Sequence, residues 1–279
     1  MIPVVLFLLV WTIYPMLESL FVSFHGYVIS RPEELPFVGL ENYWSILFGP
    51  NSPLFWGAVT TSLLYTSGVV TIEFFLGWGL AFLVRGARAE SFFRVCWMLP
   101  MLASPIGIGM IWKIMFMPEF GVACYFLGLL NVPIKAPMTT IPYALFTVMI
   151  ADIWQWTPFV FLTMLAGLKS LPKDPFEAAQ VDGATSWQVL RYLTISFLKP
   201  VILIVLILRT TDALRVFDTV WMMTLGGPGH YTEVLSVYLF RVSWRLLDFG
   251  TSTAASWIIT LIMIAVGQLF VRMIRYEEV

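Results

Sequence analysis

The hydrophobic pattern of this chain consists of long apolar runs, and the short stretches between them carry most of the charged residues. A bilayer core about 30 Å thick is crossed by roughly 20 apolar helical residues, whereas barrel strands would alternate over about 10 residues. Because helices satisfy the backbone of such runs in lipid, we predict an all-α, polytopic membrane protein made of one integral domain. The six segments long enough to span are about 2–24, 56–84, 92–117, 141–168, 200–224 and 252–271.

The composition supports this class and excludes several others. The 279 residues are 59% hydrophobic and only 12% charged, against about 25% charged residues in soluble domains. An aromatic content of 16% and only two cysteines argue against disorder and against a disulfide-rich scaffold. A formal net charge of -1 without a basic run argues against a nucleic-acid-binding surface.

The distribution of basic residues predicts the orientation in the membrane. Short loops rich in lysine and arginine face the cytoplasm, and the loops after the second and fourth segments, with the C-terminal tail, hold nine such residues against four in the opposite loops. We therefore expect residues 85–94, residues 169–199 and both termini to be cytoplasmic. The first segment lacks a basic leader and is expected to be a retained helix rather than a cleaved signal peptide. The nine are Arg85, Arg88, Arg94, Lys169, Lys173, Arg191, Lys199, Arg272 and Arg275, and the four are Arg31, Lys135, Arg241 and Arg245.

The sequence contains no familiar catalytic or metal-binding motif. A P-loop ends in Gly-Lys, and each of the five lysines follows a residue other than glycine. The two histidines, His25 and His230, lie in loops without clustered cysteines, which gives no metal site of familiar spacing. Gly-x-Ser-x-Gly is absent as well. We therefore expect a non-enzymatic chain with no metal and no cofactor of its own.

The longest predicted cytoplasmic loop, residues 169–199, contains signals for two short helices. A capping residue, a proline and an acidic first turn predict the start of one helix. A glycine predicts its end, and a Thr-Ser pair predicts the start of a second helix that ends before a proline. We expect a helix–Gly–helix elbow on the cytoplasmic face. The signals are Asp174, Pro175, Glu177, Gly183, Thr185 or Ser186, and Lys199-Pro200.

Two functions fit this elbow. Phe176, Val181 and Trp187 would let it rest on lipid headgroups as an ordinary amphipathic connector. Its small alanine side chains would equally let the backbone of another protein approach closely. The physical chemistry of the loop alone leaves both functions open.

Charged residues cluster near the middle of the fifth segment, where they need partners or water. Arg209, Asp212, Arg215 and Asp218 are spaced i, i+3, i+6 and i+9, which predicts a ladder of opposite charges about one helical turn apart. The ladder would neutralise itself and pack the helix against its neighbours, or part of it would line a water-filled path. Both roles are compatible.

Other polar residues lie in the remaining segments. Glu73 and Lys113 are single intramembrane charges that we expect to pair with neighbouring helices or with a partner subunit. In the fourth segment, Pro158 leaves a backbone carbonyl without its helical partner. The Trp and Phe side chains beside it offer flat apolar faces for a sugar ring, with Gln155 and Thr157 as hydroxyl partners, although packing alone also explains such aromatics.

The elbow also resembles a known signature. Glu177-Ala178-Ala179-x-x-Asp182-Gly183-Ala184, followed by an aliphatic stretch ending at Lys199-Pro200, is similar to the EAA motif in the membrane subunits of binding-protein-dependent ABC importers. The resemblance implies a type I importer permease fold with six transmembrane helices, in which this loop docks into a cleft on a cytoplasmic ATPase. Ser196 stands where the motif usually has proline, which implies a softer bend into the fifth segment. The coupling residues would be Glu177, Ala178, Ala179, Asp182, Gly183 and Ala184.

A second stretch resembles the carbohydrate branch of this family, the type that includes the larger maltose permease and the first glycerol-3-phosphate permease. It runs from Arg209 to Asp218 and continues as Thr224-Leu225-Gly226-Gly227-Pro228-Gly229. The maltose-type relative implies sugar contacts in the fourth segment and on one face of the fifth, but Arg209 and Val216 differ in kind from its small or polar residues, so a different contact pattern is expected. With Asp212 added from the ladder, the expected substrate path is Gln155, Trp156, Phe159, Arg209, Asp212, Ala213 and Val216.

The resemblance implies a permease subunit of an ATP-driven importer for a sugar or sugar-like solute, in a bacterial or archaeal cytoplasmic membrane. Its partners would be a homologous second permease, a dimeric ATPase that carries ATP and Mg, and an external solute-binding protein. The ladder sums to zero, which favours a neutral polyol or oligosaccharide, but a phosphorylated polyol fits if Arg209 or Arg215 is free of its carboxylate. An ion-coupled secondary transporter is the alternative, although no inverted repeat is visible. A structural or assembly factor would not need the ladder.

Overall fold

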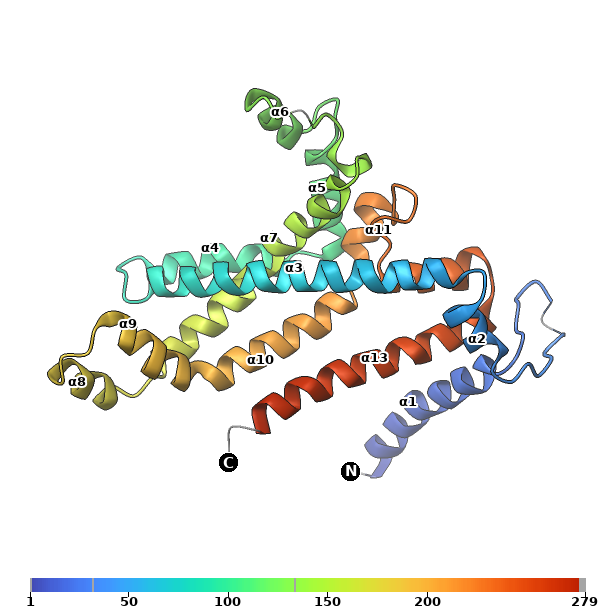
Figure 1. Cartoon of the computed structure of the whole chain (residues 1–279), viewed down its shortest axis with the longest axis horizontal. Helices are drawn as coiled ribbons and strands as arrows, with labels where there is room; N and C mark the ends of the chain where they lie inside the picture. The colour runs from blue at the N-terminus through green and yellow to red at the C-terminus, as the bar shows by residue number, and fades with distance from the viewer. Residues whose placement is uncertain (1, 32, 133, 276–279) are drawn as a thin grey trace.

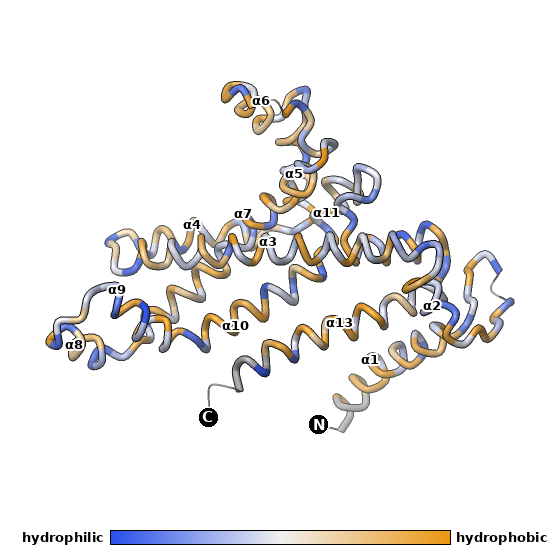
Figure 2. Tube along the Cα trace, in the orientation of Figure 1, coloured by the Kyte–Doolittle hydropathy of each residue, from blue (hydrophilic) through white to orange (hydrophobic). Residues whose placement is uncertain are grey.

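The structure, a computed structural model, describes residues 2–31, 33–132 and 134–275, and the regular structure in this part of the chain is helical. In Figure 1 the long helix α3 runs horizontally, and the long helices α1, α7, α10 and α13 run obliquely to it. The charged stretches lie mainly at the ends of these helices, while apolar residues follow their lengths (Figure 2). The five are α1 (Ile2–Ser23), α3 (Ser52–Val84), α7 (Tyr143–Lys169), α10 (Ile195–Leu214) and α13 (Phe249–Arg275).

Shorter helices connect the long ones or extend from their ends. One group, α5 and α6, projects from the top of the bundle in Figure 1, and another, α8 and α9, forms its left end. The shorter elements are α2 (Glu41–Phe48), α4 (Glu90–Leu102), α5 (Pro105–Met115), α6 (Val122–Leu129), the 3-10 turn η1 (Pro137–Thr139), α8 (Asp174–Val181), α9 (Ser186–Gln188), the π-helical turn η2 (Val189–Thr194), α11 (Asp218–Thr224), α12 (Leu235–Phe240) and the π-helical turn η3 (Arg241–Arg245).

Four continuous helices in the described part are long and apolar enough to cross a membrane. They are Ser52–Val84, Tyr143–Lys169, Ser186–Leu214 and Phe249–Phe270, and they correspond to the second, fourth, fifth and sixth predicted segments. The first predicted segment, 2–24, coincides closely with α1. The hydrophobic pattern therefore located most of the long helices.

The third predicted segment, 92–117, is not one straight helix. It is divided into α4 and α5, whose axes differ by 93°. The break lies before Pro105, because a proline disfavours helical backbone in the preceding residue, and Ser104 is extended with ψ 133°. A run of apolar residues predicts a segment buried in lipid, but it does not predict a change of direction within that segment.

The fifth segment also differs from its predicted bounds. Its helix begins at Ser186 in the predicted elbow, passes through the π-helical turn and Pro200, and ends at Leu214. The expected stop before Pro200 is therefore wrong, because a proline inside a membrane helix is tolerated where neighbouring groups satisfy the freed backbone. The expected continuation to residue 224 is also wrong, since α11 starts separately at Asp218.

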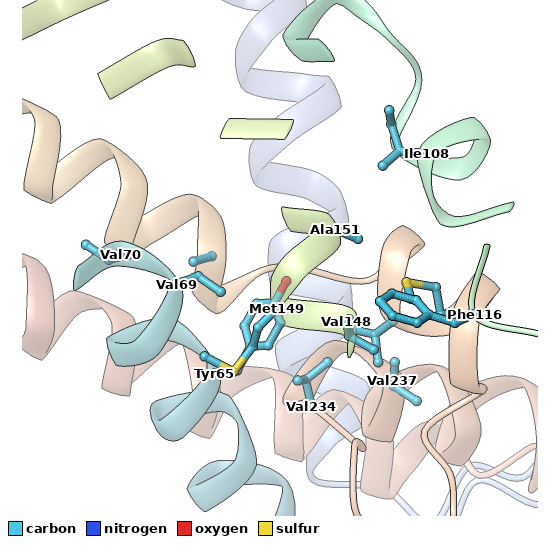
Figure 3. Packing of buried hydrophobic residues seen from close by; sticks show 13 residues of the cluster. Tyr65, Val69, Val70, Ile108, Phe116, Val148, Met149, Ala151, Val234 and Val237 are labelled. Carbon is cyan, nitrogen blue, oxygen red and sulfur yellow. The ribbon is translucent and has the colours of Figure 1, made fainter. Parts of the chain in front are cut away.

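The centre of the bundle is the contact between α3 and α7. Tyr65 and Val69 of α3 pack against Val148 and Met149 of α7 in one buried cluster (Figure 3). A Cβ atom at Gly77 would lie 2.7 Å from the Cβ of Val160, which shows how closely the two backbones approach. This packing fixes the fourth predicted segment, which carries the aromatic residues, against the segment that carries Glu73.

Candidate functional site

A buried cluster of charges joins three long helices. Arg209 of α10 donates to Glu73 of α3 through Nε (2.7 Å) and Nη2 (3.0 Å). Nη2 also donates to Asp152 of α7 at 3.0 Å. The three side chains are at most 4% exposed. A buried ionised group needs such partners, and the expected pairing of Glu73 with a neighbouring helix is confirmed.

The remaining contacts of Arg209 occupy the rest of its guanidinium. Nη1 donates to Asp212 Oδ2 at 2.5 Å, and the guanidinium carbon lies 5.0 Å from the centre of the Trp156 ring. All three guanidinium nitrogens are therefore bound to carboxylates. Arg209 holds the bundle together and is not available as a binding group for an anion.

The predicted four-residue ladder is wrong beyond its first pair. Arg209 and Asp212 are paired, but α10 ends at Leu214 and the backbone leaves the helix before Arg215 and Asp218 could continue the series. Arg215 is exposed, and within the described residues neither it nor Asp218 forms an ion pair. Irregular backbone at membrane depth is tolerated where it lines a cavity, which is the situation at this break.

A cavity of about 130 Å³ lies beside the end of α10. It brings together five residues of the expected substrate path, namely Gln155, Trp156, Asp212, Ala213 and Val216. Arg209 lies behind this wall, and Phe159 packs elsewhere, in the apolar cluster around Leu198 and Val205. The other lining residues are Pro105, Asp152, Arg215, Phe217, Asp218 and Thr219.

Gln155 gives the cavity wall an unpaired hydrogen-bond acceptor. Its side chain is 1% exposed, and its Nε2 donates to the carbonyl of Ala103 at 3.2 Å, in the break between α4 and α5. Its Oε1 has no partner among the described residues. Thr157, expected as a second hydroxyl partner, instead donates to the carbonyl of Ile153 at 2.6 Å.

The chemistry of the cavity suits a solute with several hydroxyl groups. Asp152, Asp212, Asp218 and Gln155 offer acceptor oxygens, and the rings of Trp156 and Phe217 offer flat apolar faces of the kind that sugar rings contact. Sequence reasoning missed the walls made by Pro105 and Phe217. The prolines at the α4–α5 break were a signal for the first, but the end of α10 had no comparable signal.

The elbow at residues 169–199 has the predicted helix–Gly–helix form. Gly183 has φ +77°, and Ala184 N–H donates to the Ala179 carbonyl at 2.9 Å, which closes the end of α8 in the manner of a glycine C-cap. Thr185 caps α9 in a capping box with Gln188. Asp174 is the first residue of α8 rather than its cap, a difference of one position.

The elbow presents its signature residues on the surface. Glu177, Ala178, Asp182 and Gly183 are exposed, and Ala179 and Ala184 are half-buried. In Figure 1 the elbow forms the left end of the bundle, beyond the long helices.

The apolar residues of the elbow divide into two groups. The Phe176 ring packs toward Phe197, with ring centres 6.2 Å apart, so it serves the elbow's own packing. Val181 and Trp187 are 89% and 67% exposed. The expected headgroup contact therefore applies at most to these two side chains.

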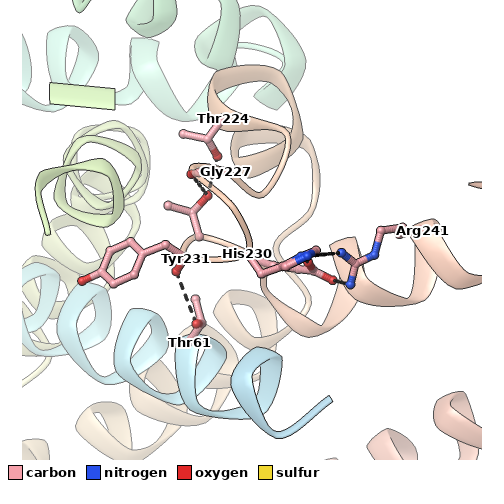
Figure 4. A network of polar contacts seen from close by, with 8 residues as sticks. Thr61, Thr224, Gly227, His230, Tyr231 and Arg241 are labelled. Atoms are coloured by element: carbon pink, nitrogen blue, oxygen red, sulfur yellow. Dashed lines mark hydrogen bonds and ion pairs between the residues drawn. The ribbon is translucent and has the colours of Figure 1, made fainter. Parts of the chain in front are cut away.

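A second polar network joins the loop after α11 to Arg241 of η3, and sequence reasoning missed it (Figure 4). Arg241 contacts His230 and Glu233, which also contact each other. Thr232 contacts Thr224 at 2.7 Å and donates to the carbonyl of Gly227 at 2.8 Å. Thr61 of α3 donates to the carbonyl of Tyr231 at 3.4 Å, which joins this loop to the bundle, and the Gly-Gly-Pro-Gly run was its signal in the sequence.

Known proteins share both the sequence pattern and the fold. Residues 73–276 match the model of the binding-protein-dependent transport system inner membrane component family. The probable ABC transporter permease protein y4oQ of Sinorhizobium fredii is 37% identical over 255 residues, covering 91% of this chain and 81% of that protein. The trehalose/maltose transport system permease protein MalF of Thermococcus litoralis is 32% identical over 277 residues, covering 99% of this chain and 92% of that protein.

A solved structure extends the likeness to three dimensions. A chain of a bacterial alginate ABC transporter, in complex with an alginate pentasaccharide-bound periplasmic protein, superposes with a TM-score of 0.81 at 19% identity, covering 99% of this chain and 92% of that chain. The fold is that of a type I ABC importer permease, a multi-pass membrane protein. The chain belongs to the family of binding-protein-dependent transport system inner membrane components. The family prediction is confirmed, and the ion-coupled alternative is not supported.

Proposed function

We propose that this chain forms half of the translocation path of an ATP-driven importer for a sugar or sugar-like solute. The observation that carries the proposal is the single helix that runs from the elbow at Ser186 to Leu214, beside the cavity lined by Gln155 and Trp156. A movement applied to the elbow would reach Asp212 and Ala213 through this helix. The name of the Thermococcus relative, a trehalose/maltose permease, supports the solute class.

The proposed assembly has four kinds of chain. A homologous second permease would complete the path, a dimeric cytoplasmic ATPase would bind ATP and Mg, and an external solute-binding protein would deliver the solute. The alginate transporter solved with its periplasmic protein supports the last of these. The complex would lie in a bacterial or archaeal cytoplasmic membrane, with both termini and the elbow on the cytoplasmic side.

The proposed mechanism follows from the separate roles of these chains. Closure of the ATPase dimer on ATP would push the docked elbow, and α7 and α10 would move with it, so that the cavity opens alternately to the two sides. Glu177, Ala178, Ala179, Asp182, Gly183 and Ala184 would form the docking surface. This chain would contribute positioning and movement, while hydrolysis takes place on the ATPase.

The cavity favours an uncharged polyhydroxy solute. Arg209 is fully occupied by Glu73, Asp152 and Asp212, so it leaves no guanidinium for a phosphate. Arg215 is the cation on the cavity wall without an ion pair among the described residues. A phosphorylated polyol would therefore depend on Arg215 alone.

Purification of the tagged chain from its native membranes tests the proposal. We expect a second permease and a P-loop ATPase to copurify and the sample to hydrolyse ATP. Glu177→Lys should abolish hydrolysis-coupled uptake, because a reversed charge in the docking surface repels the site that received the carboxylate. Glu119→Lys, a reversal at an exposed residue outside the elbow, is the matched control and should leave uptake unchanged.

The opposite results are equally informative. Unchanged uptake in Glu177→Lys would contradict the docking role. A chain that purifies alone, hydrolyses no ATP and still moves solute down an ion gradient would overturn the proposal as a whole.

A further inference from the structure

An ion pair outside the signature residues joins two helices at the end of the bundle that carries the elbow. Lys169 Nζ, at the last residue of α7, donates to Glu90 Oε1, at the first residue of α4, at 2.5 Å. Only 10% of the Glu90 side chain is exposed, against 47% of Lys169. The carboxylate is therefore held inside the structure by a cation that stands directly before the coupling loop.

Glu90 has a second set of contacts that fixes the turn after α3. The backbone N–H of Gly86, in the turn that follows α3, donates to Oε2 at 3.3 Å. Arg94 lies 3.8 Å from Oε1, but it belongs to α4 itself and joins no other helix. The hydrogen bond from Lys169 is the largest of the effects that lower the pKa of Glu90 below its ordinary value, so the carboxylate is ionised at neutral pH.

Helix α4 is also attached to α7 along the rest of its length. Trp97 lies 5.9 Å from Phe161 between ring centres. At the far end, Ala103 accepts the hydrogen bond from Gln155, and Pro105, two residues later, forms part of the cavity wall. α4 and α7 are therefore in contact near both ends of α4 and near its middle.

We propose that Glu90 and Lys169 are a positioning pair that makes α4 move together with the root of the coupling loop. Movement of the elbow would then reach the cavity not only through α7 and α10, whose residues line it, but also through α4 to Pro105. Without the ion pair, the loop would still dock, but the Pro105 wall would follow it less completely. The inference rests on the proposed importer function.

A double-mutant cycle in the full complex tests the pair. The wild type, Glu90→Gln, Lys169→Gln and the double variant would be purified with their partner chains and placed in proteoliposomes. The measured quantity is trehalose transported per ATP hydrolysed. Lys169→Arg keeps the cation, and Arg94→Gln removes the other cation near Glu90 without touching the link between helices, so these two are the matched controls.

We expect each single substitution to lower this ratio about two- to fivefold, the range that a partly exposed ion pair supports. The double variant should be no worse than either single one, because the second change removes an interaction that is already lost. Lys169→Arg and Arg94→Gln should keep the wild-type ratio. Unchanged ratios in both single variants, or additive losses in the double variant, would overturn the inference. It would also be overturned if the single variants gave less purified complex but kept the wild-type ratio.

A second measurement does not depend on the solute. Spin labels at Phe92→Cys in α4 and Trp187→Cys in α9, both exposed positions, report the distance between α4 and the elbow after Cys96 and Cys124 are replaced by serine. The wild-type distance should be equal in the nucleotide-free and ATP-bound complexes, whereas Glu90→Gln should make it change. Equal behaviour of wild type and variant would contradict the pair's role. Wild-type complexes that neither assemble nor hydrolyse ATP would instead count against the proposed function.

Discussion

The guanidinium of Arg209 obtains its counterions from three helices, and only Asp212 is near it in the sequence. The separations of 136 and 57 residues to Glu73 and Asp152 explain why spacing along one segment suggested a different set of pairs. A buried cation without carboxylates would be unstable, as would buried carboxylates without the cation. At the residue scale, burial therefore decided which carboxylates pair with Arg209. Helical periodicity accounts only for the contact with Asp212.

Arg209→Leu tests this account. Glu73 and Asp152 would be left in the bundle without their cation, and the free energy of unfolding should fall by about 3–5 kcal/mol. Thermal or denaturant unfolding of the purified chain in detergent measures the change. Arg215→Leu, at an exposed position without an ion pair among the described residues, should alter stability by no more than about 0.5 kcal/mol. Equal effects of the two substitutions would contradict the structural role of Arg209.

At the scale of elements, the close contact of α3 and α7 sets the position of both charged and aromatic groups. Glu73 and Asp152 reach the same guanidinium because these two helices pack side by side. A Cβ at Gly77 would approach the Val160 Cβ at 2.7 Å and the Phe161 backbone nitrogen at 2.8 Å, and the backbone cannot yield as a side-chain tip would. The glycine is therefore a requirement of the helix pair rather than of a turn.

Gly77→Ala should separate α3 from α7 and lower the free energy of unfolding by about 1–3 kcal/mol, the usual cost of overpacking. Gly79→Ala is the matched control in the same helix, since a Cβ there meets no atom within 4 Å. It should be neutral or stabilise by up to about 1 kcal/mol, because alanine favours helix over glycine. Unfolding midpoints of the two variants decide the question, and a stable Gly77→Ala would show that the helices are packed less tightly.

At the scale of the whole molecule, the loops separate into two sets at opposite ends of the bundle. The turn at 85–89 and the elbow lie toward the left in Figure 1, whereas the loop at 25–40 lies at the right. The basic residues favour the first set as cytoplasmic. The arrangement of loops thus agrees with an orientation that the counting of charges predicts independently.

Cysteine labelling measures this orientation. In a chain with Cys96 and Cys124 replaced by serine, Arg88→Cys should react with an impermeant maleimide only after the cells are permeabilised. Glu34→Cys, an exposed position in the loop at the opposite end, should react in intact cells. The reverse pattern would invert the proposed topology and would place the elbow away from any cytoplasmic ATPase.

The form of the elbow and most of the long helices could be predicted because their signals are local. Apolar length acts on each segment separately, and the Gly183 turn and the Thr185 capping box involve residues only a few positions apart. The family signature in the elbow added a function that periodicity does not contain. The roles of its residues in docking stay predictions.

The sequence by itself determined the class of protein, the positions of most helices and the form of the elbow, since hydrophobic burial and capping are properties of short segments. Only the tertiary structure decided that α4 and α5 meet at a sharp angle, that α10 ends at Leu214, and that Arg209 binds Glu73 and Asp152. These features depend on charges and backbone groups that lie far apart in the chain. Their partners become known only when the helices have packed.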